Sequence, residues 1–225
     1  MGKIPLLSLL ETRVLGVLVE KEHTVPDTYP LSRNALTAGC NQKNNRDPVI
    51  EAHETEVQAA LDSLRAHTLV IESSGTRVTR YAHNIGRVLG IPSQSVALMA
   101  ALMLRGPQTA AELRSATERM HRFADVSSVE AFLTELAERG EDAGGPLVVK
   151  LARAAGEREA RWAHLLSVPV ASASGQGDTP ALGGAADISL SELDALRANQ
   201  VRLTAEVADL RGKLERMAAE LGILL

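Results

Sequence analysis

A four-residue pattern occurs twice in this chain of 225 residues. Arg80-Tyr81-Ala82-His83 returns, 81 positions later and almost unchanged, as Arg161-Trp162-Ala163-His164. That offset is about the length of one small domain, so the pattern predicts two tandem copies of one fold. The repeat constrains the whole chain, because every further element must then be found in both copies.

Hydrophobic periodicity divides the first copy into three helices and a hairpin. The capping box Ser8-Leu9-Leu10-Glu11 predicts the start of a helix that runs to about Lys21. A second helix is expected over 31–40, and a third is predicted from apolar residues that share one helical face: Val57, Ala60, Leu61 and Leu64. Strands are predicted at 69–71 and 78–83, with a turn at 73–76. Three helices followed by a hairpin is the order of a winged helix.

The second copy repeats this order. Ser93-Gln94-Ser95 predicts the cap of a helix that ends at Arg105, before Gly106 and Pro107. Further helices are expected over 109–120 and along the apolar face from Val129 to Leu136, with strands at 147–151 and 158–165. More residues separate the third helix from the return strand here than in the first copy, which predicts a longer wing. Tyr81 and Trp162, which fall in the two return strands, are predicted to anchor each hairpin to its helices.

Composition limits the class of protein. Hydrophobic residues make up 45% of the chain and aromatic residues 2%, which favours modest cores built from aliphatic helices. Cys40 is the single cysteine, so an intramolecular disulfide is excluded, and residues 1–10 lack the pattern of a signal peptide. Apolar runs are shorter than the roughly 18 to 20 residues that cross a bilayer. We therefore expect a cytoplasmic protein without membrane insertion.

The C-terminal part has a different character. Residues 168–187 are rich in Ala, Ser, Gly and Pro, which predicts a flexible linker. Residues 188–225 carry an apolar heptad, which predicts a parallel two-stranded coiled coil and a homodimer. A single amphipathic helix that packs on its own domains is the alternative. The candidate dimerisation residues are Leu193, Leu196, Leu203, Val207, Leu210, Leu214 and Leu221.

Two long stretches resemble the bacterial YceH family. They are Leu18 to Leu36, with the polar run Glu-Lys-Glu-His-Thr-Val-Pro-Asp-Thr-Tyr-Pro, and Cys40 to Val49. The segments 104–109 and 111–114 are also similar, and the resemblance covers about residues 8–167. It implies a tandem winged-helix fold and leaves the biochemical role open.

The fold prediction is therefore a mainly α protein with small β-hairpins (α+β). Two tandem winged-helix domains are expected at 1–90 and 91–167, followed by the linker at 168–187 and the coiled-coil helix at 188–225.

Charge argues against the usual groove-binding role of the third helix. The net charge of −4 leaves both copies without a basic excess, although phosphate contacts dominate nucleic-acid affinity. Each third helix carries three acids and one base: Glu54, Glu56 and Asp62 with Arg65, then Glu130, Glu135 and Glu138 with Arg139. Acidic residues can accept hydrogen bonds from cytosine, so the groove hypothesis is weakened and not excluded.

Basic residues gather instead in the connectors between the second and third helices and in the wings. The first connector predicts an exposed polar cluster: Asn41, Gln42, Lys43, Asn44, Asn45 and Arg46. Arg119 and Arg122 lie at the equivalent place in the second copy, and Arg158 and Arg161 in its wing. These candidates could hold phosphates or an acidic protein. The alternatives are a tight helix-linking turn at 41–47, and wing arginines that pair with Glu157 and Glu159 or are simply solvated.

The residues give little support for catalysis. Cys40 with His23 or His53 lacks a third ligand or orienting group at a recognisable spacing, so no catalytic, metal or cofactor residue is predicted. Gly140 and Gly145 have the glycine spacing of a phosphate-binding loop, but Pro146 and Leu147 stand where it needs lysine and a hydroxyl residue. We expect a non-enzymatic, homodimeric binding protein, an adaptor or regulator acting mainly on a protein partner. The alternative is a DNA-binding transcriptional regulator that contacts phosphates through its wings.

Overall fold

The computed structural model describes residues 6–74, 78–153 and 156–167 of the chain. By its contacts the chain divides into residues 1–178 and 179–225, and every described residue belongs to the first of these units. The described part combines helices with two small antiparallel sheets, which confirms the α+β class. The predicted linker at 168–187 and the predicted coiled-coil helix at 188–225 both lie outside the described ranges.

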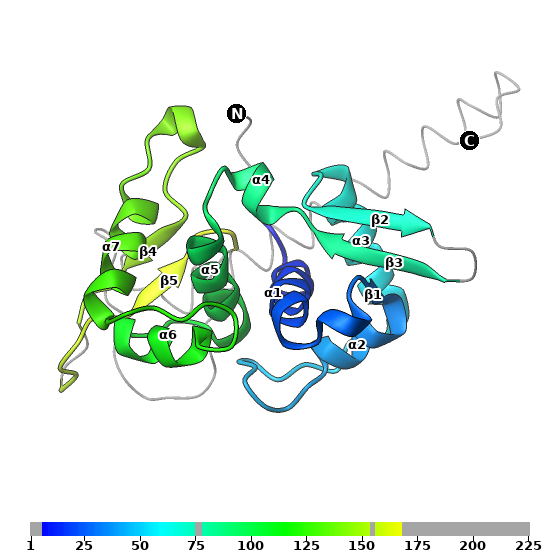
Figure 1. Ribbon diagram of the computed structural model, residues 1–225, viewed down its shortest axis with the longest axis horizontal. Coiled ribbons are helices and arrows are strands. Elements are labelled where there is room, and N and C mark those ends of the chain that lie inside the picture. The colour runs from blue at the N-terminus through cyan, green and yellow to red at the C-terminus, as the bar shows by residue number, and fades with distance from the viewer. Residues whose placement is uncertain (1–5, 75–77, 154–155, 168–225) are drawn as a thin grey trace, which may run out of the picture. The chain divides into compact units, whose positions relative to one another are not determined.

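The first half holds three longer helices and a three-stranded sheet (Figure 1). Its elements are α1 (Leu9–Thr24), β1 (Leu31–Ser32), α2 (Arg33–Cys40), α3 (Glu54–Ala66), β2 (Val70–Ser74) and β3 (Thr79–His83). The sheet order is β1-β3-β2. A short 3₁₀ turn, η1 (Pro26–Thr28), follows α1, and the short helix α4 (Ile85–Leu89) leads to the second half.

The second half repeats the same order with a two-stranded sheet. Its elements are α5 (Ser93–Arg105), α6 (Ala110–Thr117), α7 (Val126–Ala137), the 3₁₀ turn η2 (Glu141–Ala143), β4 (Val148–Lys150) and β5 (Trp162–His164). The two halves also agree in register. Leu31 pairs with Tyr81 in the first half, and Gln108 forms an isolated bridge with Trp162 in the second.

Local sequence signals set most helix ends. The predicted capping box at Ser8 and Glu11 is present, and Thr109 with Glu112 forms another at the start of α6. Each box satisfies two backbone N–H groups that have no partner within the helix. The predicted serine cap of α5 is wrong, because Pro92 occupies the N-cap position and Ser93 is already helical.

Three further expectations differ from the structure in detail. The second helix begins at Arg33 because Leu31 and Ser32 are extended and pair with β3. The predicted turn at 73–76 begins too early, since β2 extends to Ser74. Periodicity also missed α4, which is shorter than two helical turns and ends at Gly90 with a positive φ of 63°.

Tyr81 and Trp162 anchor the two hairpins, as the repeated pattern predicts. Each side chain is 4% exposed and belongs to the buried core. Aromatic side chains of this size contribute large buried areas. The repeat at 80–83 and 161–164 therefore marks a packing position in each half.

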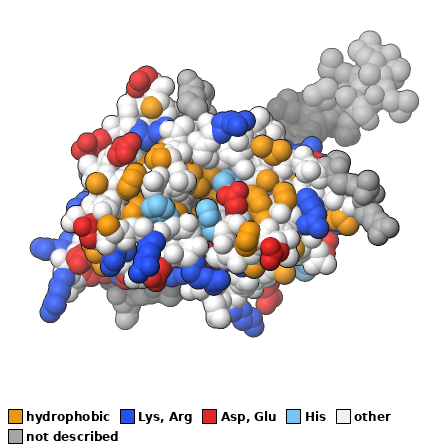
Figure 2. Space-filling view, viewed as in Figure 1, with side chains coloured by type: hydrophobic (Ala, Val, Ile, Leu, Met, Phe, Trp, Pro, Cys, Tyr) orange, Lys and Arg blue, Asp and Glu red, His pale blue; other side chains and the backbone are white. Residues whose placement is uncertain are grey.

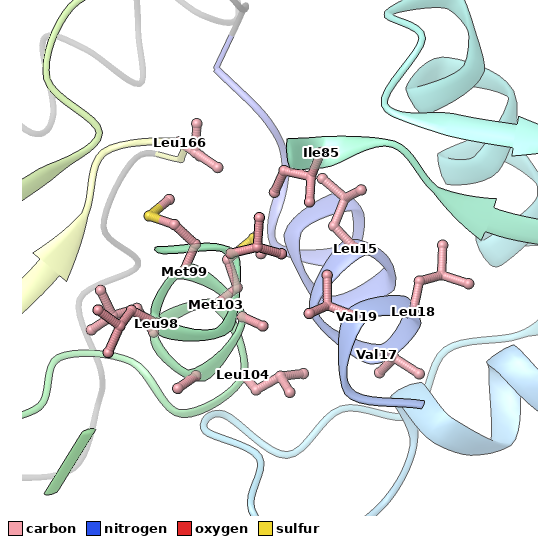
Figure 3. Close-up of a cluster of buried hydrophobic side chains, with 14 of the residues drawn as sticks. Leu15, Val17, Leu18, Val19, Ile85, Leu98, Met99, Met103, Leu104 and Leu166 are labelled. Carbon is pink, nitrogen blue, oxygen red and sulfur yellow. The ribbon is translucent and has the colours of Figure 1, made fainter. Parts of the chain in front are cut away.

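The two halves share one core, which is built around α1 and α5 (Figure 1). Periodicity predicted one apolar face for α1, yet every residue from Thr12 to Val19 is buried. In α5 the same holds from Ser95 to Leu104. Figure 3 shows side chains of the two helices, among them Val19 and Leu104, pointing toward one another. A helix that is buried all round must have neighbours on opposite sides.

The two halves are also tied by a close backbone approach and by pairing between the segment before α1 and the segment after β5. A Cβ at Gly16 of α1 would lie 2.8 Å from Leu104 Cγ of α5, so only glycine fits this crossing. The backbone N–H of Leu7 donates to Leu166 O at 2.7 Å. The segment before α1 therefore pairs with the segment after β5, and residue 167 lies beside the start of the first half.

Candidate interaction surface at the junction of the two halves

The connector between α2 and α3, residues 41–53, is held by a buried arginine of α1. The guanidinium of Arg13 donates from Nη1 to Cys40 O at 3.1 Å and from Nη2 to Pro48 O at 2.6 Å. Arg13 is 0% exposed, and burial, together with the nearby charge of Arg46, lowers its pKa below the usual value. The Arg13 side chain thus holds the backbone at Cys40, where the connector begins, and at Pro48, in its middle.

Arg46 was predicted to lie exposed in this connector, and that prediction is wrong. Its side chain is 0% exposed and forms a two-pronged ion pair with Glu20 of α1, at 2.7 and 3.1 Å. It also donates to Gly39 O, Asn45 O and Gln42 Oε1. A buried guanidinium needs such partners because an unpaired buried charge is strongly unfavourable.

The ion pair also changes the acidity of Glu20. Burial raises the pKa of this carboxyl, but hydrogen bonds and charge from Arg46, with a smaller effect of Lys21, outweigh burial. The net pKa of Glu20 therefore lies below its usual value. The carboxylate form is the one that the folded structure stabilises.

The other connector residues divide into one structural side chain and an exposed group. Asn41 accepts from Ala52 N at 2.8 Å and donates to Ala52 O at 2.9 Å, which closes the far end of the connector. Gln42, Lys43, Asn44 and Asn45 are exposed. Asn45 has a φ of 59°, which is the left-handed backbone geometry that asparagine tolerates. This geometry agrees with the alternative interpretation of residues 41–47 as a tight turn between two helices.

The first arginine of each repeated pattern has an equivalent structural role. Arg80 donates to the backbone oxygens of Thr28 and Pro30, just before β1 and α2. Arg161 donates to Pro107 O, just before α6, and pairs with Glu112 and Glu157. For Arg161, the alternative interpretation of a wing arginine that pairs with Glu157 is therefore the arrangement in the structure.

Other predicted basic residues remain at the surface of the second half. Arg119, Arg122 and Arg158 are exposed, and none forms an ion pair with another residue of the described part. Lys150 lies over the ring of Trp162, 5.3 Å from its centroid. In Figure 2, charged side chains of both signs are distributed over the face shown.

The acids of the two third helices have different surroundings. In α3, Glu54 pairs with Arg33 of α2 at 3.1 Å, and Glu56 accepts from the backbone of His53 in a capping arrangement. In α7, Glu130 and Glu135 are exposed and have no ion-pair partner among the described residues.

Arg139, the basic residue just after α7, does not pair with the acidic residues of this helix. Arg139 turns inward and donates to the backbone oxygens of Leu89, Ala143 and Gly145. The outer surface of α7 therefore carries carboxylates that have no ion-pair partner among the described residues, whereas Glu54 of α3 is paired with Arg33.

Part of the connector and part of the second wing meet in one open depression at the junction. It has a volume of about 660 Å³ and is lined by Asp47, Arg105, Pro107, Gln108, Ala111, Glu112, Ser115 and Arg161. Asp47 comes from the connector, and its N–H donates to Leu104 O of α5 at 2.8 Å. Among the predicted site residues, the structure thus brings Arg161 to the junction and places Lys43 and Arg158 outside the depression.

Sequence reasoning missed Arg105 and Gln108 as candidates. Arg105 ends α5 and has no ion pair or side-chain hydrogen bond within the described ranges. Gln108 is buried and donates from Nε2 to Ala101 O and Gly106 O, which leaves its Oε1 without a donor from the described residues. The sequence signal that could have identified Arg105 is its position directly before Gly106 and Pro107, where the helix ends.

Burial shifts the pKa values of the cysteine and of one histidine. Cys40 is 0% exposed, and burial raises the pKa of its thiol to about 12. Burial lowers the pKa of His164 to about 4, so its ring is neutral near pH 7. In the ranges that the structure covers, no three His, Cys, Asp or Glu side chains gather in a way that could hold a metal ion. Nor does any helix there have the length and apolar character to span a membrane.

The fold and the junction define the class as an α+β protein with a duplicated helix-and-hairpin unit and one shared core. A family model described as a protein of unknown function, DUF480, matches residues 7–157, and the chain belongs to this family. A UPF0502 protein of Burkholderia vietnamiensis is 59% identical over 217 residues, covering 96% of this chain and 90% of the relative. One from Leptothrix cholodnii is 58% identical over 222 residues, with 97% of each chain covered.

Proposed function

We propose that this chain is a non-enzymatic tandem winged-helix protein, an adaptor or regulator that binds mainly a protein partner. The winged-helix interpretation, with modules at 1–90 and 91–167, is supported by the order of elements in both halves and by the β1-β3-β2 sheet.

The acidic outer surface of α7 is the observation that carries the choice of a protein partner. A winged helix that enters a DNA groove presents this helix to phosphates, and unpaired carboxylates there would be repelled. Because Arg139 is held by backbone oxygens inside the fold, it cannot compensate for Glu130 and Glu135. A protein surface tolerates this charge pattern, and a partly basic one complements it.

DNA binding remains the second candidate, supported by Arg119, Arg122 and Arg158 on the surface of the second half. These side chains could contact phosphates through the connector and wing of the second half. Dimerisation would then offset weak binding by a single module.

A salt series on random duplex DNA separates the two candidates. Under the protein-binding proposal, association is weak, and the triple change of Arg119, Arg122 and Arg158 to Ala has little effect. Tight binding that falls steeply with salt and is lost in this variant would replace the first proposal by the second. Arg87→Ala is the control, because it removes an exposed cation of α4 that is not among the candidate phosphate contacts. Affinity capture from nuclease-treated native lysate then identifies protein partners.

Homodimerisation through residues 188–225 is part of the proposal and is supported by the heptad pattern. Mass measurement in solution with and without this segment tests it: we expect a dimer that becomes a monomer on truncation. A full-length monomer at micromolar concentration would contradict it. Cell fractionation tests the proposed cytoplasmic location.

A further inference from the structure

We propose that the junction depression binds a mixed-charge protein segment, with a partner carboxylate against Arg105 and a partner cation against Asp47. This inference rests on the proposed function and specifies the chemistry of the partner. It assigns the contact to residues that neither the repeat nor the charge pattern of the sequence singled out.

Arg105 is the guanidinium at this junction that has neither a hydrogen bond nor an ion pair with a described residue, although the carboxylate of Glu20 is near enough to interact with its charge. Arg13 is bound to two backbone oxygens, Arg46 to Glu20, and Arg161 to Glu112 and Glu157. Arg105, by contrast, is partly exposed, lines the depression and has no bonded partner among the residues described. A partly desolvated guanidinium is a strong site for a carboxylate, which it can bind through two parallel hydrogen bonds.

Acceptors lie beside this cation. The exposed carboxylate of Asp47 is close to Gly106, since Asp47 Oδ2 lies 3.9 Å from the position of a Cβ built there. Gln108 also lines the depression, and its amide nitrogen is already used by Ala101 O and Gly106 O. Its Oε1 is therefore oriented as an acceptor, and together with Asp47 it suits an ammonium or guanidinium group.

The mixed charge distinguishes a protein from a nucleic acid. A phosphate backbone would meet Arg105 but also the carboxylates of Asp47 and Glu112 in the same depression. A protein segment with neighbouring side chains of opposite sign satisfies both. The opening, about 660 Å³ in volume, has room for a few side chains.

The lining is also fixed before binding. Asp47 is held by its backbone bond to Leu104, and the connector around it by Arg13 and Arg46. Arg105 and Gln108 lie on either side of the Gly106-Pro107 helix stop. Because the backbone that carries these groups is already ordered, association loses less conformational entropy than it would in a loose loop.

The test follows the arginine Nε–H and the Gln108 side-chain amide NMR signals of the full-length protein during titration with acetyl-Glu-Lys-amide. The Gln108 signal reports binding in the variant that lacks Arg105. We expect a saturable shift of the Arg105 Nε–H signal in the millimolar range, and binding about fivefold weaker for acetyl-Gln-Lys-amide and acetyl-Glu-Gln-amide. Arg105→Gln should remove the preference for Glu, and Asp47→Asn the preference for Lys. Arg87→Gln, which changes an exposed arginine of α4 outside the depression, should leave both preferences unchanged.

Several results would overturn the inference. They are the absence of a saturable shift up to about 20 mM peptide, equal binding of all three peptides, or unchanged preferences in Arg105→Gln. Saturation of the Arg105 signal by inorganic phosphate or duplex DNA at lower concentration than by peptide would assign the site to nucleic acid instead. A protein partner that binds wild type and Arg105→Gln equally would refute this site and leave the proposed function intact.

Discussion

The ion pair of Arg46 with Glu20 makes the sharpest stability prediction. The Arg46 side chain is 0% exposed and that of Glu20 is 17% exposed, so each depends on the other inside the fold. Removing one partner of a buried pair costs about 3 to 5 kcal/mol. Because Glu20 keeps some contact with water, we expect Arg46→Met to lower the free energy of unfolding by about 3 kcal/mol. For a unit of this size that corresponds to a melting temperature roughly 10 °C lower.

A double-mutant cycle makes the reasoning specific to the pair. Glu20→Gln should cost about as much as Arg46→Met, and the double variant less than the sum by about 1 to 3 kcal/mol. Urea unfolding followed by circular dichroism measures all four proteins. Lys43→Met is the control, since this exposed connector residue should change stability by no more than about 0.5 kcal/mol. The reasoning is refuted if Arg46→Met stays within about 1 kcal/mol of wild type, or if the two changes are additive.

Four further expectations follow from the described contacts. The folded-state pKa of Glu20 lies below its usual value of 4.5, so the stability that its carboxylate contributes is present above that value and is lost as pH falls through the folded-state pKa. When urea midpoints are measured against pH, they should fall less in Glu20→Gln than in wild type on acidification. Gly16→Ala should cost about 1 to 3 kcal/mol by overpacking against Leu104, and a second change, Leu104→Ala, should make Gly16→Ala less harmful, as measured by thermal unfolding. Cys40 should react with a thiol reagent only at the rate of unfolding, because it is buried and its pKa is raised to about 12; fast labelling of the native protein would contradict this. Trp162→Ala should lower the free energy of unfolding by about 3 to 5 kcal/mol in urea, and a loss below about 1 kcal/mol would show that Trp162 does not anchor its hairpin.

The candidate site shows where sequence reasoning stops. The polar run Asn41 to Arg46 looks exposed in a linear reading, because none of its residues is apolar. The partner of Arg46 is Glu20, 26 positions earlier on α1, and no local pattern pairs the two. Conversely, Arg105 appeared only as the end of a helix. Its place beside Asp47 depends on how α5 packs against the first half.

The duplication had a similar limit. It predicted two equivalent units and correctly placed Tyr81 and Trp162 in the core. It could not show that the acids of α3 are partly neutralised by Arg33, whereas Arg139 turns away from those of α7. Equivalent positions in a repeat acquire different neighbours, and those neighbours set the local charge.

By itself, the sequence determined the α+β class, the order of three helices and a hairpin in each half, and several helix ends, among them the start of α1 and the ends of α2 and α5. Capping, periodicity and turns are local properties. The tertiary structure alone decided that α1 and α5 are buried all round, that the two halves share one core, and that a connector arginine is structural. Periodicity identifies an apolar face but not which element covers it. A charged side chain is buried only where distant residues supply its partners, and only the folded chain brings those residues together.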